Sequence, residues 1–557
     1  MFQSQFARRG AGVAAITAVS ALVLGACAGG GETASTDGEV TGAAPAEQEG
    51  LGAGYIVDYS EWGEAYEGTI TVEDVPGPCS WEEMSKKDYS GQTLRILSHV
   101  PPVLGEPAQL HADQFAEITG ATVEVEQVPF PDIFSKSQLS FQTGVSAYDV
   151  IFGGSQWIGD FQQYYATVPD TYLNDTELAD STDLVKQIAQ WNGETKLYSI
   201  DADRHYLKYR TDVINDADAQ AAYLAATGNE LRVPQTWSEY NEQAAFFAEQ
   251  YAAGSWSPAA QPAGVDFYGS VEVMARDNLM FSAFISRVGP YAKHPDVTGG
   301  FWFDENMSPQ VNNPGFVRGL EDFVEAVSFV PPGYSSFGLA EEITSFSKGE
   351  ALFSYTWDDA YVGANQADSP IRENVAAAPL PGADEVWNRV TGEWETPAGG
   401  VNYAPYISWG WTSVVTADSP VQQMAFDYLC FFGNKANHTI DLSIGRFGVN
   451  PGRTEDFSVD FWTEQVGWED QAATSYIDTM QNYEENTNRV FDLRVPGNGE
   501  FYTAMANGVA EALAGQKSPQ EALDDVAAEW ETIIERIGPD VIEEAYQAVI
   551  RLEDNLD

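Results

Sequence analysis

Tryptophan residues stand beside glycines and acidic residues at three points of the chain. These points are Trp157, the pair Trp357-Asp358, and the triplet Trp409-Gly410-Trp411. The flat face of an indole can stack on a ring, and a carboxylate accepts paired hydrogen bonds from hydroxyl groups. Together they suit a ligand that has apolar faces and polar edges, of which a sugar is the simplest example.

Histidine and cysteine offer little chemistry in comparison. The chain has 5 histidines and 3 cysteines, and no His/Cys/Asp cluster has the spacing of metal ligands. We therefore expect no metal and no cofactor. Glycoside hydrolysis needs only two carboxyl groups at a suitable separation, and 84 acidic residues leave that alternative open.

The charge of the chain is strongly negative. Acidic residues outnumber basic ones 84 to 27, for a formal charge of -57. Nucleic-acid binding requires basic surface, so that class of function is excluded. Because the acids are spread along the whole chain, we interpret them as a solvating surface rather than as a site for a cationic ligand.

The N-terminus has the features of an export signal. An apolar run from Ala14 to Ala26 follows two arginines, and it is shorter than the ~20 residues that a membrane-spanning helix needs. The run ends in Leu24-Gly25-Ala26-Cys27, which resembles the bacterial lipoprotein signature. This resemblance implies that Cys27 carries lipid and becomes the mature N-terminus. The alternative is an ordinary cleaved signal with a chance cysteine.

Residues 28–54 contain no aromatic residue, lysine or arginine. Such a segment cannot bury enough surface to offset its chain entropy. We expect a flexible tether that holds a globular body at the outer face of the cytoplasmic membrane.

Two cysteines remain if Cys27 is lipidated. Cys79 precedes the first predicted strand, and Cys430 lies in the apolar helical stretch from Ala425 to Phe432. An even number of cysteines in an oxidising compartment favours a disulfide, which would attach the N-terminal extension covalently to the globular part of the chain. Two separate buried thiols are the alternative.

Strand and helix patterns alternate after this extension, in a chain of 557 residues that is long enough for two or more domains. Strands are predicted at 93–97, 122–126 and 148–152, with helices around 110–118 and 133–141. This order predicts a parallel α/β sheet with covering helices. Ligands bind outside the carboxyl ends of such strands, where Trp157 lies.

Several segments resemble, in the same order, those of family 1 extracellular solute-binding proteins, the maltose-binding type that serves ABC importers. They are YDVIFGGSQWIGDF, GETKLYSIDADRHYLKYRTDVI, VPQTWSEY, SFSKGEALFSYTWDDAY, AAAPLPGA, ISWGWTSVVTADSPVQQMAFDYLCFF and SPQEALDDVAAEWETII. The resemblance runs from about Thr93 to Gly538. A long N-terminal extension, Tyr55 to Ser90, and an expanded second half depart from it.

This resemblance implies a two-lobed α/β fold of the periplasmic-binding-protein type. Each lobe would be a mainly parallel sheet flanked by helices, and hinge strands would join the two. The implied boundaries are a signal peptide at 1–26, the tether and extension at 27–90, lobe 1 at 91–205 and 408–470, and lobe 2 at 206–407 and 471–557.

Ligand contacts are expected in the cleft between the lobes, from Trp157, Asp203, Arg204, Asp277, Trp357, Asp358, Trp409, Trp411 and Arg446. The family places a stacking aromatic near Trp357 and a carboxylate that binds hydroxyls near Asp203. A turn ion pair is the alternative for Asp203, and a solvated helix acid is the alternative for Asp277. Arg446, a cation in a very acidic chain, could instead pair internally.

The implied function is that of a monomeric, membrane-anchored protein that binds a sugar or oligosaccharide and delivers it to ABC permease subunits. No catalytic residue is expected. The alternatives are a lipid-anchored carbohydrate-active enzyme, a binder of a polyol, polyamine or peptide, and a scaffold lipoprotein without a small ligand.

Overall fold

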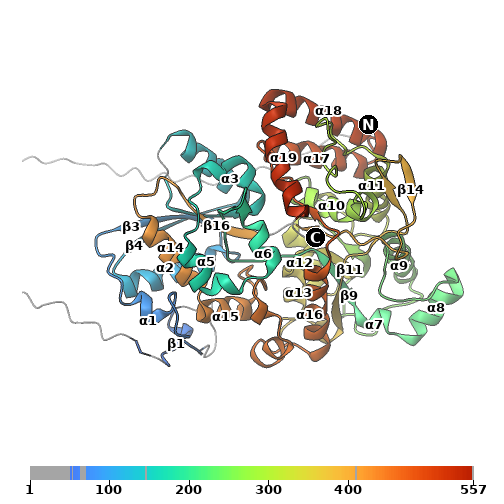
Figure 1. The fold of residues 1–557 in the computed structure, drawn as a ribbon. Helices are drawn as coiled ribbons and strands as arrows, with labels where there is room; N and C mark the ends of the chain where they lie inside the picture. Colours follow the sequence, from blue (N-terminus) through green and yellow to red (C-terminus); the bar gives the residue numbers. More distant parts are fainter. Residues whose placement is uncertain (1–50, 53, 63–70, 145–146, 408–409, 555–557) are drawn as a thin grey trace, which may run out of the picture. The chain divides into compact units, whose positions relative to one another are not determined.

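The computed structural model describes residues 51–52, 54–62, 71–144, 147–407 and 410–554. Cys27, the predicted signal peptide, most of the predicted tether and Trp409 lie outside the described residues. The ordered chain forms the mixed α/β fold expected from the sequence, with two main sheets and helices around each (Figure 1). Both sheets belong to one structural unit, residues 50–557.

Five strands form the first sheet, and the part of the chain built on it is called lobe 1 here. In spatial order they are β4 (Thr122–Val128), β3 (Thr93–His99), β5 (Val150–Gly154), β16 (Trp411–Val415) and β8 (Tyr198–Ser199). The three predicted strands are thus confirmed as β3, β4 and β5. Strand β5 is buried along its whole length, as a strand covered on both faces must be.

Three helices contact this sheet or one another around it. They are α2 (Gly105–Thr119), α3 (Phe130–Gln142) and α14 (Gln422–Phe432). Helix α2 ends where Gly120 takes the left-handed conformation, at φ 72°, which glycine adopts without steric cost.

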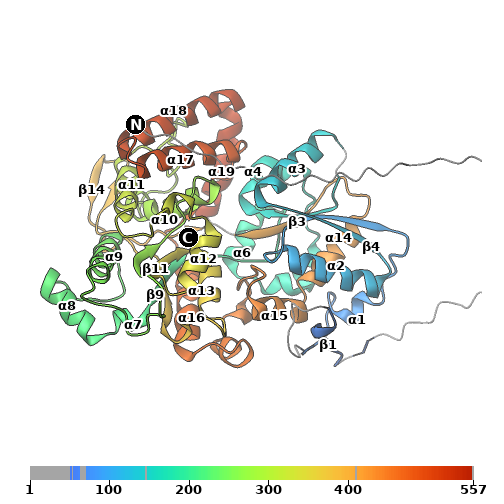
Figure 2. The same ribbon diagram turned by 180° about the vertical axis from the view of Figure 1, so that it is seen from behind.

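Four strands form the second sheet, and the part of the chain built on it, with the C-terminal helices, is called lobe 2. In spatial order they are β10 (Tyr268–Val271), β11 (Ala351–Thr356), β9 (Tyr206–Arg210) and β12 (Val375–Ala378). Around it lie α9 (Trp237–Ala252), α10 (Asn278–Ala292), α11 (Pro314–Ala326), α12 (Leu339–Ser347) and α16 (Asp470–Glu485) (Figure 2). Helix α9 begins after Thr236, whose side chain accepts from the Glu239 N–H.

Both sheets are mainly parallel, as expected, and each contains one strand that runs against all the others. In lobe 1, β16 runs antiparallel to β5 and β8. In lobe 2, β9 runs antiparallel to β11 and β12. These two strands follow the crossings between the lobes, and they enter each sheet against the direction of their neighbours.

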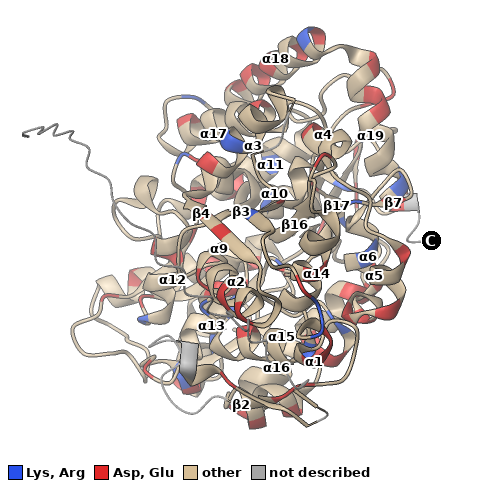
Figure 3. Ribbon diagram, turned by 90° about the vertical axis from the view of Figure 1, so that its left-hand side faces the viewer, with Lys and Arg blue, Asp and Glu red and all other residues tan. Residues whose placement is uncertain are grey.

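The C-terminal helices complete lobe 2. They are α17 (Asn498–Leu513), α18 (Pro519–Ile537) and α19 (Pro539–Asp554), and α17 packs on α10, α11 and α18. Helix α18 begins with a capping box in which Ser518 and Glu521 bond each other's backbone. Acidic residues are spread over many of the helices, and basic residues are few (Figure 3). In the portion that the structure describes, no helix combines the length and apolarity needed to cross a membrane.

The N-terminal extension is fastened to lobe 1. A disulfide joins Cys79 to Cys430 of α14, with the two Cα atoms 5.0 Å apart. Tyr59 Oη and Trp81 Nε1 both donate to Oδ1 of Asn437, at 2.6 and 3.1 Å, on helix α15 (Lys435–Ile444). Because these contacts are buried, we interpret the extension as a structural part of lobe 1.

Removing the disulfide should destabilise the protein. A Cys79→Ser, Cys430→Ser double variant releases a closed loop with a sequence separation of 351 residues. We expect the free energy of unfolding to fall by about 2–5 kcal/mol, because the unfolded chain regains conformational freedom. Urea denaturation measures the change, and a reductant should have no further effect on the double variant. An unchanged unfolding midpoint would contradict this assignment.

Candidate functional site

Aromatic side chains of lobe 1 gather at the carboxyl end of β5. Trp157 ends the short 3₁₀ turn Ser155–Trp157 and stacks on Phe130, with centroids 5.1 Å apart and planes at 30°. Trp411 meets the same Phe130 edge-on at 5.2 Å and lies 5.1 Å from His99. Phe130 therefore brings the two predicted tryptophans together in one aromatic wall.

Gly153 permits this arrangement. A Cβ at that position would stand 2.5 Å from the Trp157 ring. The indole folds back over the strand end only because the glycine has no side chain. Gly153 is thus required by the packing of Trp157, which is 6% exposed.

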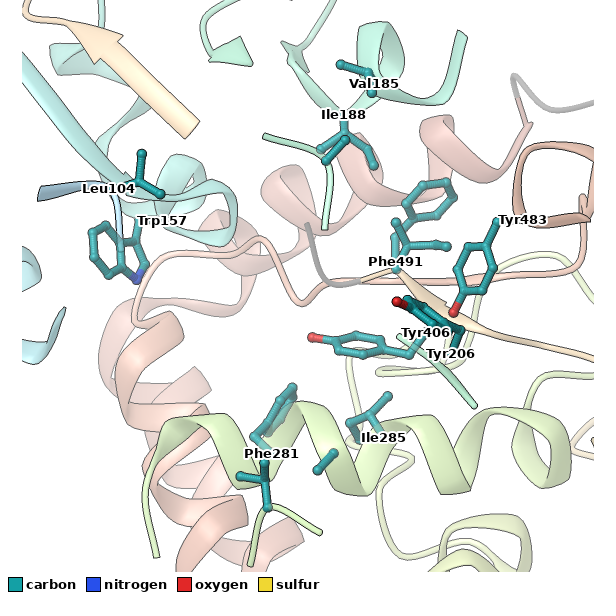
Figure 4. Close-up of a cluster of buried hydrophobic side chains, with 14 of the residues drawn as sticks. Leu104, Trp157, Val185, Ile188, Tyr206, Phe281, Ile285, Tyr406, Tyr483 and Phe491 are labelled. Carbon is teal, nitrogen blue, oxygen red and sulfur yellow. The ribbon is translucent and has the colours of Figure 1, made fainter. Parts of the chain in front are cut away.

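A second aromatic group comes from lobe 2. Trp357 follows β11 and meets His205 edge-on, with centroids 4.4 Å apart. His205 in turn lies 5.8 Å from Tyr406, the first residue of β15 (Tyr406–Ile407). The hydroxyls of Tyr406 and Tyr502 both donate to Oδ1 of Asp492. Figure 4 shows Tyr406 and Trp157 in the same buried cluster, together with Phe281 of α10.

Several polar atoms of this group have no hydrogen-bond partner in the described chain. They are Nε1 of Trp357, Nε2 of His205, and Nε and Nη1 of Arg494. Arg494 is 2% exposed and donates only through Nη2, to the Gln190 carbonyl at 3.1 Å. Burial lowers the pKa of Arg494 to about 10, partly offset by Asp492. The N–H groups of Trp357 and Arg494 would gain from a ligand rich in oxygen atoms.

The crossing between the lobes contains a buried pair of acids. Asp201 accepts from the backbone N–H groups of Trp411 and Asn450, both at 2.9 Å. Oδ1 of Asp203 accepts from Nδ2 of Asn450 at 2.8 Å. A Cβ at Gly410 would stand 2.3 Å from Oδ2 of Asp203 and 2.5 Å from Oδ2 of Asp201. Only glycine fits between the two carboxyl groups and the returning strand.

Burial controls the ionisation of this pair. Burial, opposed by the hydrogen bond from Trp411 and supported by the nearby charge of Asp358, raises the pKa of Asp201 to about 7. Burial, followed by the charge of Asp201, also raises the pKa of Asp203. Near neutral pH, the two carboxyl groups therefore retain a proton between them.

Arg204 and Asp358 are engaged by the protein itself. Asp358 is fully buried and accepts from the Arg204 backbone N–H at 2.9 Å and from the Tyr476 hydroxyl at 2.5 Å. The Arg204 guanidinium bonds Glu484 of α16 at 2.6 Å, and it also donates to two backbone carbonyl groups. These contacts join the crossing segment to lobe 2, so the geometry gives both residues a structural role.

The structure does not bring two other predicted residues into this group. Asp277 is exposed and caps α10, accepting from the N–H groups of Leu279 and Met280 at 2.8 and 3.2 Å. Arg446 pairs with Glu106 at 3.0 Å and is half exposed. For Arg446, the contact corresponds to the internal pairing that the acidic composition suggested.

Several contributors were not chosen from the sequence, among them Phe130, Asp201 and His205. Tyr406, Asp492 and Arg494 stand outside the segments that carry the family resemblance, and long-range packing brings them into the site. Within the described residues, no group of three or more His, Cys, Asp or Glu residues could hold a metal ion.

Comparison with known proteins places the chain in a family. The sequence profile of bacterial extracellular solute-binding proteins matches residues 111–467. The chain belongs to this family, which confirms the resemblance found in the sequence motifs. A probable amino-acid ABC transporter periplasmic-binding protein of Sinorhizobium fredii is 24% identical over 302 residues, or 53% of this chain. That alignment spans 63% of the length of the relative.

Solved structures of similar fold are two-lobed binding proteins. An ABC transporter solute-binding protein from Agrobacterium radiobacter, in complex with ribitol, has a TM-score of 0.63 and 21% identity, covering 80% of this chain and 100% of that chain. Maltose-bound MalE3 of T. maritima has a TM-score of 0.62 and 19% identity, with coverage of 80% and 100%. A mannitol-bound protein from Agrobacterium vitis has a TM-score of 0.60 and 18% identity, with coverage of 80% and 99%. At these identities the likeness shows the two-lobed fold.

The acid pair predicts an unusual pH dependence of stability. Because the pKa of Asp201 is raised to about 7 in the folded protein, folding favours the protonated pair, and this contribution is lost as pH rises through about 7. An Asp203→Asn variant keeps the oxygen that accepts from Asn450 and removes one charge. We expect it to be more stable than the parent by roughly 1–3 kcal/mol at pH 8, with little difference at pH 5.

Denaturant unfolding at the two pH values measures this difference. Asp203→Ala is the control, because it removes both the charge and the acceptor. A destabilised Asp203→Asn protein at pH 8 would show that both carboxylates are charged and needed.

Proposed function

We propose that this protein binds a sugar or oligosaccharide between its two lobes and delivers it to the permease of an ABC importer. The observation that carries the proposal is that each lobe has an aromatic group next to the crossing segments, and that the group of lobe 2 includes N–H donors without a partner among the described residues. Trp157, Phe130 and Trp411 offer flat faces, while Trp357 and Arg494 offer donors for hydroxyl oxygens. Among other solutes a polyol is the nearest alternative, because it has the same oxygen-rich surface.

Contacts between the lobes support binding by closure. Phe134 of α3 meets Trp157 edge-on at 5.4 Å, and it also lies 4.0 Å from where a Cβ at Gly499 of α17 would stand. Hinge motion at the crossing strands would separate these groups and admit a solute, and a bound solute would stabilise the closed state. The proteins with ribitol, maltose and mannitol bound support this class of ligand by analogy of fold.

Binding without catalysis is the simplest chemistry for this arrangement. The buried acids are held by backbone amides and tyrosine hydroxyls, and the proposed role of the aromatic groups is stacking. Prolonged incubation with oligosaccharides, followed by mass analysis of the products, tests the alternative of a carbohydrate-active enzyme. Cleaved products would overturn the proposal.

The indole N–H of Trp357 gives the sharpest test of the site. Nε1 has no partner in the described chain, so a Trp357→Phe change removes a donor that only a ligand would use. We expect binding to weaken by about tenfold, roughly 1.4 kcal/mol, while the melting temperature changes little. Calorimetric titration of a panel of sugars and polyols measures the affinity.

Trp394→Phe is the matched control, because Trp394 is 37% exposed on the hairpin of lobe 2 and should leave binding unchanged. Unchanged affinity in Trp357→Phe, together with a lowered melting temperature in Trp357→Ala, would show that Trp357 is a core residue.

We also propose that a lipid on Cys27 anchors the protein at the outer face of the cytoplasmic membrane. A Cys27→Ala variant should leave the membrane fraction and appear in the medium or the soluble extracytoplasmic fraction, because the lipid attachment point is lost. Fractionation of cells that express parent and variant measures the change. Retention of the variant in membranes would contradict lipid anchoring.

A further inference from the structure

The backbones of the two lobes come close together directly after Trp157. Helix α4 (Ile158–Phe161) of lobe 1 begins directly after this residue and meets the segment that leads into α17 of lobe 2. A Cβ at Gly159 would stand 2.6 Å from the carbonyl carbon of Arg494 and 2.6 Å from the backbone nitrogen of Val495. Any larger residue at this position would force the two segments apart.

The next residue completes the contact. Oδ1 of Asp160 accepts from the backbone N–H of Gly497 at 2.7 Å. Gly497 is the N-cap of α17, and having no side chain, it leaves the first amides of the helix without a cap from their own segment. An acidic residue of lobe 1 therefore accepts a hydrogen bond at the N-terminus of a helix of lobe 2. Negative charge is also favourable at this end of a helix.

Burial supports a specific role for Asp160. Burial raises the pKa of Asp160 to about 6, although hydrogen bonds from the Gly497 and Asn498 backbones oppose the shift. Its second oxygen is buried without a partner among the residues that the structure describes. Burying the Asp160 carboxyl group in this way costs free energy. We therefore interpret its position as fixed by the contact between the lobes rather than by solvent.

Both sides of the contact lead directly to the candidate site. Trp157 precedes α4, and Tyr502 lies in the second turn of α17, where its hydroxyl bonds Asp492. Opening the lobes would break the bond from Asp160 to Gly497 and separate these aromatic residues. Forming the bond would bring them together.

We propose that Asp160 caps helix α17 across the lobe boundary and that Gly159 admits this contact, so that the two residues set the closed position and hence the affinity for the solute. The proposal rests on the proposed function, because it assumes that closure accompanies binding. Asp160 and Gly159 are positioning residues that need not touch the solute.

Three variants test the proposal. Asp160→Ala removes the cap, Asp160→Asn keeps an oxygen that can accept from Gly497, and Gly159→Ala inserts a methyl group between the backbones. With the tightest binder among maltose, ribitol and mannitol, calorimetry should show about 3- to 30-fold weaker binding for Asp160→Ala, the range that loss of an N-cap produces. Asp160→Asn should bind within about threefold of the parent, and Gly159→Ala should bind more weakly than the parent.

Hydrogen exchange without any solute separates this proposal from the proposed function. The Gly497 amide should be protected in the parent and in Asp160→Asn, and it should exchange faster in Asp160→Ala, with unchanged protection in the five-stranded sheet of lobe 1. We expect this exchange result even if none of the three solutes binds. A failure of all three to bind would contradict the proposed ligand class but not the proposed cap. Equal exchange in all three proteins, or Asp160→Asn behaving as Asp160→Ala, would overturn the cap.

Discussion

The carboxylate of Asp201 holds together the crossing on which the rest of the molecule depends. It accepts backbone N–H groups from Trp411 and Asn450, segments that are distant in sequence and meet only where the chain passes between the sheets. Without this acceptor, those amides would be buried unpaired, at a cost of about 1–3 kcal/mol each. Asp203 lies beside it, and Gly410 is required because no side chain fits against the two acids. The position of Trp411, and through Phe130 that of Trp157, follows from this arrangement.

The lobe boundary combines strongly satisfied groups with unsatisfied ones. Asp201 and Asp358 have close partners, whereas ring or guanidinium nitrogens of Trp357, His205 and Arg494 have no partner among the residues that the structure describes. The first group fixes the crossing strands, so the hinge keeps its geometry. The nitrogens of the second group can still form hydrogen bonds with a bound solute. A protein that must bind a solute and release it again needs both properties.

Local patterns predicted the elements well and the site only in part. Strands β3, β4 and β5 were predictable because a short stretch of sequence is enough to show an apolar run or an alternation of apolar and polar residues. The resemblance of the motifs then indicated the two-lobed fold. Trp157 could be placed from the sequence at the carboxyl end of a strand, and Trp411 at the crossing between the lobes, while their contact with a ligand stays a prediction. Asp277 shows the limit, since a carboxylate that caps a helix has the same sequence appearance as one that binds a ligand. The surroundings of His205, Asp492 and Arg494 are formed by tertiary contacts, which cannot be predicted from the periodicity of the sequence.

A crystal structure of the protein grown with its tightest-binding sugar or polyol tests the central claim most directly. The account predicts the solute between Trp157 of lobe 1 and Trp357 of lobe 2, with a solute oxygen accepting from the indole Nε1 of Trp357. Lobe 2 also has a surface hollow of about 490 Å³, lined in part by Trp394, Arg318 and Glu385. A solute bound there or elsewhere on one lobe, with Nε1 of Trp357 still unpartnered, would contradict the account.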